Sequence, residues 1–156
     1  MFCERRCSWP SNQYRYSVKK QFKIILATCF VHLTPPKHHA RASMMIDDVL
    51  SQSPDNVTCL MGRGYVLQEA TRWAEAWPLF SRVEGLLPGD VTEGLRAKEE
   101  AAWCSCQLGD LQTAIAGLQD TLKALQGQND RSHDIARCLW RIGQCFWKMG
   151  RGDTDF

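Results

Sequence analysis

Apolar residues recur every three or four positions along most of this chain, a spacing that places them on one face of a helix. From residue 42 onward the pattern predicts a succession of helices with short connections. The predicted helices run over 42–52, 57–70, 73–86, 92–108, 111–126 and 134–149. No segment sustains the alternation of apolar and polar residues that is typical of a strand. We therefore expect an all-α fold.

These helices form pairs that repeat along the sequence. Pro54 and Pro88 lie 34 residues apart, and each ends a helix because proline cannot continue one. Between them, a first helix carries the small residue Gly64, and a second helix carries Ala76 and then Phe80. A helix pair of this period and composition is typical of tetratricopeptide repeats. The sequence therefore predicts a solenoid of antiparallel helix pairs, with about two and a half repeats.

The same plan continues after Pro88. Ala102 and Gly143 take the small position of two further first helices, and Ala114 followed by Leu118 repeats the step from alanine to a large residue. Small residues let two helices approach closely, while large ones fill the space between neighbouring pairs. The predicted structural positions of the repeat are Gly64, Leu67, Ala76, Phe80, Pro88, Ala102, Ala114, Leu118, Gly143 and Phe146.

The last predicted helix, 134–149, has no partner helix after it in this sequence. Trp140, Phe146 and Trp147 cannot all face one neighbour, so we expect part of this apolar surface to be exposed. Exposed apolar surface of this kind favours self-association through the unpaired helix.

The first forty residues do not follow the repeat, so we divide the chain into 1–40, a repeat region over 41–150, and a tail over 151–156. One amphipathic helix is expected over 17–33. Its apolar positions are Val18, Phe22, Ile25, Leu26, Cys29, Phe30 and Leu33. Three interpretations stay open: a helix that packs on 42–52, a mitochondrial presequence, or a leader foreign to the repeat protein. The change of charge just before Ala40 favours the third.

Charge is divided unevenly along the chain. Residues 1–41 contain eight Lys or Arg and one acidic residue, whereas residues 42–156 contain eleven Lys or Arg and sixteen acidic residues. The repeat region is therefore mildly acidic and is a poor candidate for binding a phosphate backbone. We expect no direct, specific binding to nucleic acid.

Cysteine and tryptophan are frequent, and the simplest interpretation of both is packing. The helical cysteines are Cys59, Cys104, Cys106, Cys138 and Cys145. Because no CxxC motif accompanies them, we expect buried, reduced thiols in a reducing compartment rather than disulfides or a zinc site. The tryptophans at helical spacing are Trp73, Trp77, Trp103, Trp140 and Trp147, and core or inter-repeat packing is expected for them.

No pattern in the sequence indicates catalysis. The GxSxG, HExxH, GxGxxG and Walker A motifs are all absent from the sequence. The adjacent acidic pairs Asp47-Asp48 and Glu99-Glu100 should point apart on their helices, which favours solvated surfaces over acid–base chemistry. His133 is expected to be an exposed residue in the first turn of its helix. We therefore expect a protein that is not an enzyme and that binds no cofactor and no metal.

Three stretches are more specific than the general repeat: PDNVTCLMGRGYVLQ over 54–68, EEAAWCSCQLGDLQTAI over 99–115, and RCLWRIGQCFWKMG over 137–150. Through these three stretches, residues 41–150 resemble the tetratricopeptide scaffold subunit of the fungal superkiller complex. The resemblance implies a protein that holds a helicase and a propeller subunit together. It also implies a role in exosome-mediated decay of mRNA from the 3′ end, in the cytoplasm, with the nucleus as the alternative location. No active-site residue is carried over.

Two other classes of function are weighed against this scaffold. A co-chaperone adaptor of the same repeat type would hold acidic peptide tails with basic residues and Asn on its first helices. Met61 and Tyr65 stand at the corresponding surface here, which disfavours that class. An enzyme or metal protein that uses the cysteines is the third class, and it lacks a recognisable motif.

Overall fold

The computed structural model describes residues 12–32, 38–88, 91–128 and 130–152, and this part of the chain is helical with no strand. Its elements are α1 (Asn12–His32), α2 (His39–Gln52), α3 (Val57–Glu69), α4 (Trp73–Leu86), α5 (Thr92–Gln107), α6 (Leu111–Gln126) and α7 (Ser132–Gly152). The predicted residues 1–11, Leu33 and most of the 151–156 tail lie outside the described residues.

The prediction of an all-α repeat solenoid is confirmed. Each of the six predicted helices corresponds to one of α2 to α7, with ends that differ by three residues at most. Local capping explains two of the starts. The Asn56 side chain accepts a hydrogen bond from the backbone N–H of Cys59 over 3.0 Å, and Asp110 accepts one from Thr113 over 3.2 Å. Such caps satisfy N–H groups that have no partner inside the helix.

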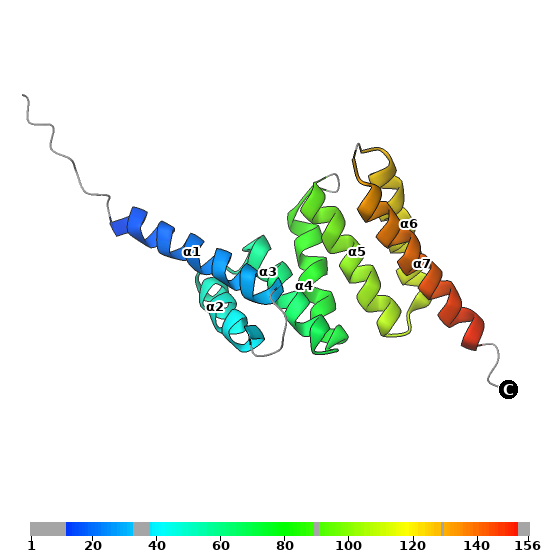
Figure 1. Cartoon of the computed structure of the whole chain (residues 1–156), viewed down its shortest axis with the longest axis horizontal. Coiled ribbons are helices and arrows are strands. Elements are labelled where there is room, and N and C mark those ends of the chain that lie inside the picture. The colour runs from blue at the N-terminus through cyan, green and yellow to red at the C-terminus, as the bar shows by residue number, and fades with distance from the viewer. Residues whose placement is uncertain (1–11, 33–37, 89–90, 129, 153–156) are drawn as a thin grey trace, which may run out of the picture.

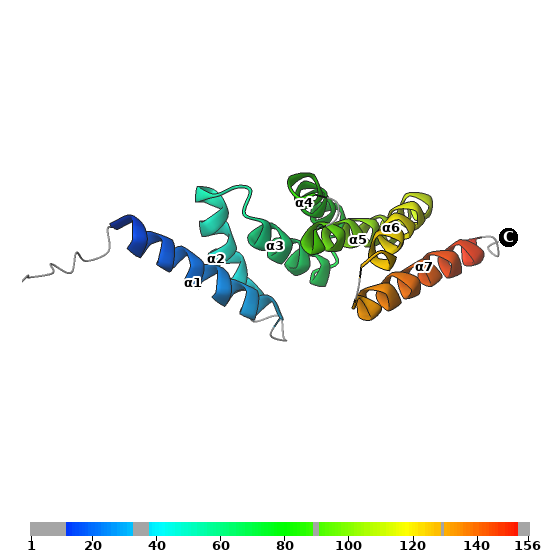
Figure 2. The ribbon, with the colours of Figure 1, turned by 90° about the horizontal axis from the view of Figure 1, so that it is seen from above.

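The helices follow one another along the long axis of the molecule, with α1 and α7 at opposite ends (Figure 1). Figure 2 shows two rows. We call α1, α3, α5 and α7 the first-helix row, and α2, α4 and α6 the second-helix row. Each helix packs on its neighbours in sequence, and α1 also contacts α3 while α5 contacts α7. The described part of the chain therefore has four first helices, one more than the sequence pattern indicates.

The turns after α3 and α5 are built alike. In both, a backbone N–H donates to the carbonyl five residues earlier, from Arg72 to Leu67 over 2.9 Å and from Asp110 to Ser105 over 3.0 Å. This bond is characteristic of the Schellman motif, which needs one residue in the left-handed region. Gly109 takes that conformation in the second turn with φ of 92°, whereas Thr71 takes it in the first with φ of 57°.

Close contact between a glycine and a phenylalanine joins α3 to α4. A Cβ atom added to Gly64 would lie 2.4 Å from the ring of Phe80, which is fully buried. Helix α5 is buried on two sides. Its Cys104 lies in one core cluster with Phe80, and its Cys106 lies in the next cluster with Leu118. The core is therefore continuous along the solenoid, as nearest-neighbour stacking requires.

Helix α1 packs on the array through a face that includes Phe30 of the predicted apolar stripe but otherwise lies beside that stripe. Ile24 and Ala27 are buried against Ala42 and Ile46 of α2. Val18, Ile25 and Cys29 of the predicted apolar stripe are exposed, as is Phe22 at 62%. Both faces of α1 carry apolar residues. Because Ala27 is small, α2 can approach closely on the face that carries it, and this is the face that becomes buried. This contact is the one described by the first of the three interpretations of residues 1–40; the division into 1–40, 41–150 and 151–156 stays a prediction.

Candidate functional site

A groove of about 270 Å³ opens on the first-helix row between α1, α3 and α5. Its apolar wall includes Val31 of α1 with Met61 and Tyr65 of α3, and its α5 wall includes Glu93 and Arg96. Arg96 and Glu93 are exposed, while Tyr65 is half-buried and hydrogen-bonded to Arg96. Burial raises the pKa of Tyr65 to about 12, further above neutral pH than the ordinary value of a tyrosine. The groove therefore offers an apolar floor beside one acidic and one basic group, a combination suited to binding a peptide side chain.

Next to the groove, two adjacent glutamates are buried, which corrects the expectation of a solvated face. Glu99 is only 1% exposed and Glu100 is also buried. Arg137 of α7 donates to the Glu99 carboxylate from Nε over 2.7 Å and from Nη2 over 2.6 Å. Arg141, one turn further along α7, donates to Glu99 over 3.0 Å. The two arginines lie roughly 40 residues from the glutamates in sequence, so helix spacing within α5 gives no sign of the pairing.

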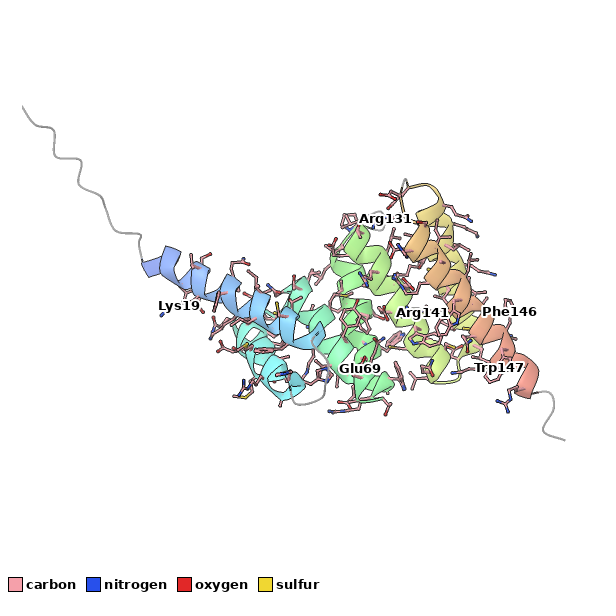
Figure 3. The ribbon with its side chains drawn as sticks, viewed as in Figure 1. Lys19, Glu69, Arg131, Arg141, Phe146 and Trp147 are labelled. Atoms are coloured by element: carbon pink, nitrogen blue, oxygen red, sulfur yellow. The ribbon has the colours of Figure 1, made fainter. Side chains whose placement is uncertain are left out.

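Arg141 joins both glutamates and an aromatic ring. Its Nη2 donates to the two carboxylate oxygens of Glu100 over 3.0 and 3.2 Å, and its guanidinium lies 5.2 Å from the centre of the Trp103 ring. Gln68 of α3 donates to Glu100 over 3.1 Å. Figure 3 shows Arg141 on the α5 side of α7. We call this set, Gln68, Glu99, Glu100, Arg137 and Arg141, the ion-pair clamp; it joins α3, α5 and α7.

A third acidic group extends the clamp at the start of α7. Asp134 accepts a hydrogen bond from Arg137 over 2.8 Å and one from Arg131 over 3.4 Å. Burial alone would raise the pKa of Asp134, but the bonds from Arg137 and Arg131 lower it, so the carboxylate stays ionised. The hydrogen bonds that Arg137 donates to Glu99 raise the pKa of Arg137. Since charged partners occupy these carboxylates, the arrangement serves to hold α7 on α5 rather than to transfer protons.

The five cysteines of α3, α5 and α7 are free thiols and are buried in the structure, whereas Cys29 of α1 is free and exposed. Burial is the main cause that raises the pKa of Cys59 and Cys104 to about 11, and that of Cys138 and Cys145 to about 12. These four thiols are therefore protonated at neutral pH and act as small apolar groups. Within the described residues, no group of three or more His, Cys, Asp or Glu side chains is placed to hold a metal ion.

The predicted repeat positions divide into two groups. The buried ones are Gly64, Leu67, Ala76, Phe80, Ala102, Ala114 and Leu118. The exposed ones are Pro88, which follows α4, and Gly143 and Phe146, which lie on the side of α7 turned away from α5 and α6. Figure 3 shows Phe146 and Trp147 on the C-terminal part of α7. The importance of these positions for function stays a prediction.

Three tryptophans are exposed; this corrects the expectation of core packing, and at Trp140 and Trp147 it confirms the expectation that part of the apolar surface of the last helix is exposed. Trp77 and Trp147 are exposed, and Trp140 is 57% exposed. Trp73 and Trp103 are half-buried. Trp140 contacts the Trp103 ring at 5.7 Å between centroids, and the guanidinium of Arg151 lies 4.7 Å from the Trp147 ring centre. Helical spacing places a tryptophan on a face but does not show whether another helix covers that face.

Comparison with known proteins relates this chain to superkiller protein 3 of two organisms. No protein-family model matches the chain. The chain is 32% identical to superkiller protein 3 of Saccharomyces cerevisiae over 129 residues, which is 82% of this chain and 9% of that protein. It is 28% identical to superkiller protein 3 of Schizosaccharomyces pombe over 122 residues, which is 78% of this chain and 8% of that protein.

The longer match also changes the extent of the resemblance. Because it covers 82% of a chain of 156 residues, it includes part of 1–40 wherever it begins. The expectation that the resemblance is limited to 41–150 is therefore too narrow. The chain spans less than a tenth of the length of either relative. The helix-pair solenoid agrees with this relationship. The chain is homologous to a segment of superkiller protein 3.

Proposed function

We propose that this chain is a non-enzymatic scaffold segment that binds proteins through the groove on its first-helix row. The observation that carries the proposal is the combination of an open groove and the ion-pair clamp beside it. The clamp fixes α3, α5 and α7 relative to one another, so the groove wall is held in place before a partner arrives. Preorganised surfaces bind at a lower entropic cost.

The homology supports a role in the superkiller complex. On this proposal the partners are those that the resemblance implies, a helicase and a propeller subunit, and the assembly supports exosome-mediated mRNA decay in the cytoplasm. None of the described helices is both long and apolar enough to cross a membrane.

A pull-down with the full chain as bait tests the proposal. The bait is incubated with fungal extract, and the bound proteins are identified by mass spectrometry. Arg96→Glu reverses the charge at the edge of the groove on an exposed residue, so the fold should be kept. Lys123→Glu makes the same change on an exposed residue of α6, in the other row.

We expect the wild type and Lys123→Glu to recover a helicase or exosome-linked protein, and Arg96→Glu to recover much less. Equal recovery by all three baits would move the binding site away from the groove. Recovery of chaperones alone would favour the co-chaperone adaptor instead. Circular dichroism of each bait verifies that both variants remain helical.

A further inference from the structure

The turn between α2 and α3 carries the one Ser-Pro pair of the sequence, Ser53-Pro54. Ser53 directly follows α2, and its backbone lies outside the helical region, with φ of −144° and ψ of 81°. A residue before proline is disfavoured in the helical region. Ser53 is partly exposed and Pro54 is exposed. Because proline-directed protein kinases modify an accessible, non-helical serine that precedes proline, the turn has the local form of a phosphorylation site.

A lysine of α1 already contacts the Ser53 side chain. Lys20 Nζ donates a hydrogen bond to the Ser53 hydroxyl, although the two residues are 33 positions apart. Next to this contact, a hollow of about 90 Å³ opens between α1 and α2. Lys20 and Gln52 are among its lining residues, together with Lys19 and Lys23. A group added to the Ser53 oxygen would therefore meet Lys20, beside a hollow that two further lysines line.

Positive charge in this hollow is only partly balanced. Lys23 pairs with Asp48 of α2, the one carboxylate that lines the hollow within the described residues. In that part of the chain, Lys19 and Lys20 form no ion pair. Helix α1 itself contains no acidic residue, and Figure 3 shows Lys19 on its N-terminal half. Two positive charges are therefore left without a carboxylate in the hollow beside Ser53.

We propose that Ser53 is a phosphorylation site and that Lys19 and Lys20 bind its phosphate, which ties α1 to the turn after α2. In the reaction the Ser53 oxygen forms a bond to the terminal phosphorus of ATP, the bond from that phosphorus to the ADP oxygen breaks, and the hydroxyl proton is released. Phosphoserine carries a charge of about −2 and three acceptor oxygens. Its hydrogen bonds to ammonium groups are charge-assisted at both ends, which makes them stronger than the present bond from Lys20 to a neutral hydroxyl.

Two features act against a phosphate at this position. Ser53 lies at the C-terminal end of α2, where the helix dipole disfavours negative charge. Asp55 is the nearest carboxylate along the chain, but Arg82 already pairs with it. The helix end is equivalent to about half an elementary charge, whereas Lys19 and Lys20 contribute two full charges. The lysines therefore decide the sign, and phosphorylation should stabilise the contact between α1 and α2.

A kinase assay tests the modification. The full chain is incubated with ATP and a mitogen-activated protein kinase, which is proline-directed, and modified residues are identified by tandem mass spectrometry. Thr34→Val is present in all samples, because Thr34 is the other Ser or Thr that precedes proline. We expect phosphate at Ser53 and none at Ser51, which is exposed but precedes Gln52. No phosphate at Ser53, or equal amounts at both serines, would overturn the proposal.

Phosphoserine incorporated during translation tests the effect without a kinase. It is placed at position 53 or, as the matched control, at position 51, where the Ser51 hydroxyl donates to the Asp48 carbonyl instead of contacting α1. We expect phosphate at position 53 to slow hydrogen exchange of the α1 amides by about tenfold, the effect of one charge-assisted hydrogen bond. Phosphate at position 51 should leave this exchange nearly unchanged.

Substitutions of the lysines identify the groups that bind the phosphate. The double change Lys19→Gln and Lys20→Gln removes both unpaired charges, so the difference in exchange with and without phosphate at position 53 should disappear. Lys23→Gln removes a charge that already has a partner, and the difference should persist. Faster exchange of α1 on phosphorylation, or a difference that survives the double change, would contradict the proposed contact. Neither exchange experiment nor kinase assay contains a partner of the groove, so their outcome is independent of the scaffold function.

Discussion

At the residue scale, the structure depends on one glycine whose lack of a side chain makes room for an aromatic ring. Three ring atoms of Phe80 lie within 2.9 Å of the place that a Cβ on Gly64 would take. The ring is fully buried and is surrounded by Leu60, Ala76 and Val83 in the same cluster. A buried ring in a packed cluster has little space to move, so any side chain at Gly64 must push it or the helix away.

We therefore predict that Gly64→Ala lowers the free energy of unfolding by about 1–3 kcal/mol through overpacking. Alanine is the better helix former, so propensity alone would act in the opposite direction. Gly85→Ala isolates propensity, because Gly85 lies in open space within α4. It should raise the free energy of unfolding by about 0.5–1 kcal/mol. Urea unfolding followed by circular dichroism measures both. A stabilising Gly64→Ala would show that α3 and α4 are further apart than described.

At the element scale, the turns after α3 and α5 can be compared residue by residue, because they share one hydrogen-bond pattern. The turn after α5 has glycine at its left-handed position and Asp110 as the cap of α6. The turn after α3 has the same hydrogen bond but carries Thr71 and Arg72 at these positions, and the Arg72 side chain makes no cap. A β-branched residue in the left-handed region is strained. The first turn is thus a less stable version of the second.

Replacing Thr71 by Gly should consequently stabilise the chain, by about 1 kcal/mol, because glycine takes positive φ at no steric cost. The reverse change, Gly109→Thr, should destabilise it by about 1–2 kcal/mol. Thermal unfolding of the two variants gives opposite shifts of the melting temperature if the turns are equivalent. Shifts of the same sign would mean that Thr71 is held by contacts that compensate its strain.

The ion-pair clamp sets the position of α7, and its loss is expected to act on that helix first. Arg141→Met leaves Glu100 buried without its guanidinium, so we predict a loss of about 3–5 kcal/mol and faster hydrogen exchange in α7 than in α3. Arg82→Met breaks an ion pair with Asp55 in which both side chains are about half exposed. That control should cost about 0–1 kcal/mol. Equal losses in the two variants would contradict the distinction between a buried clamp and a surface pair.

Sequence reasoning succeeded where the signal is local and missed what depends on distant partners. The ends of α2 to α7 follow from proline, capping residues and apolar spacing, all of which are read within a few positions. The burial of Glu99 depends on Arg137, which only the packing of α7 brings near. The buried face of α1 depends on where α2 lies, because Ile24 and Phe22 are equally apolar candidates. Exposed Trp140 shows the same limit: periodicity marks a face but does not identify what covers it.

At the scale of the whole molecule, charge and shape point to protein partners. The acidic excess of residues 42–156 lies on the part of the chain that forms α2 to α7. Several of its arginines are already paired: Arg137 and Arg141 with the buried glutamates, and Arg82 with Asp55. The basic excess of the chain lies instead in residues 1–41, where Lys23 of α1 pairs with Asp48 of α2. The solenoid therefore has few cations available for a phosphate backbone.

This distribution leads to a prediction about RNA. The full chain should bind single-stranded RNA only weakly, with Kd of roughly 10⁻⁴–10⁻⁶ M at physiological salt, as for non-specific binding to duplex DNA. Whatever binding occurs should fall steeply as salt is raised, because it arises from the lysines and arginines of residues 1–41. Fluorescence anisotropy with labelled RNAs of different sequence, at two salt concentrations, measures both properties. Lys19→Glu, on an exposed residue of α1, should weaken binding, whereas Lys123→Glu on α6 should change it less, because Lys123 lies outside the basic residues 1–41. Sub-micromolar binding that selects one sequence and resists salt would show base recognition, and the scaffold function would then have to include RNA as a direct ligand.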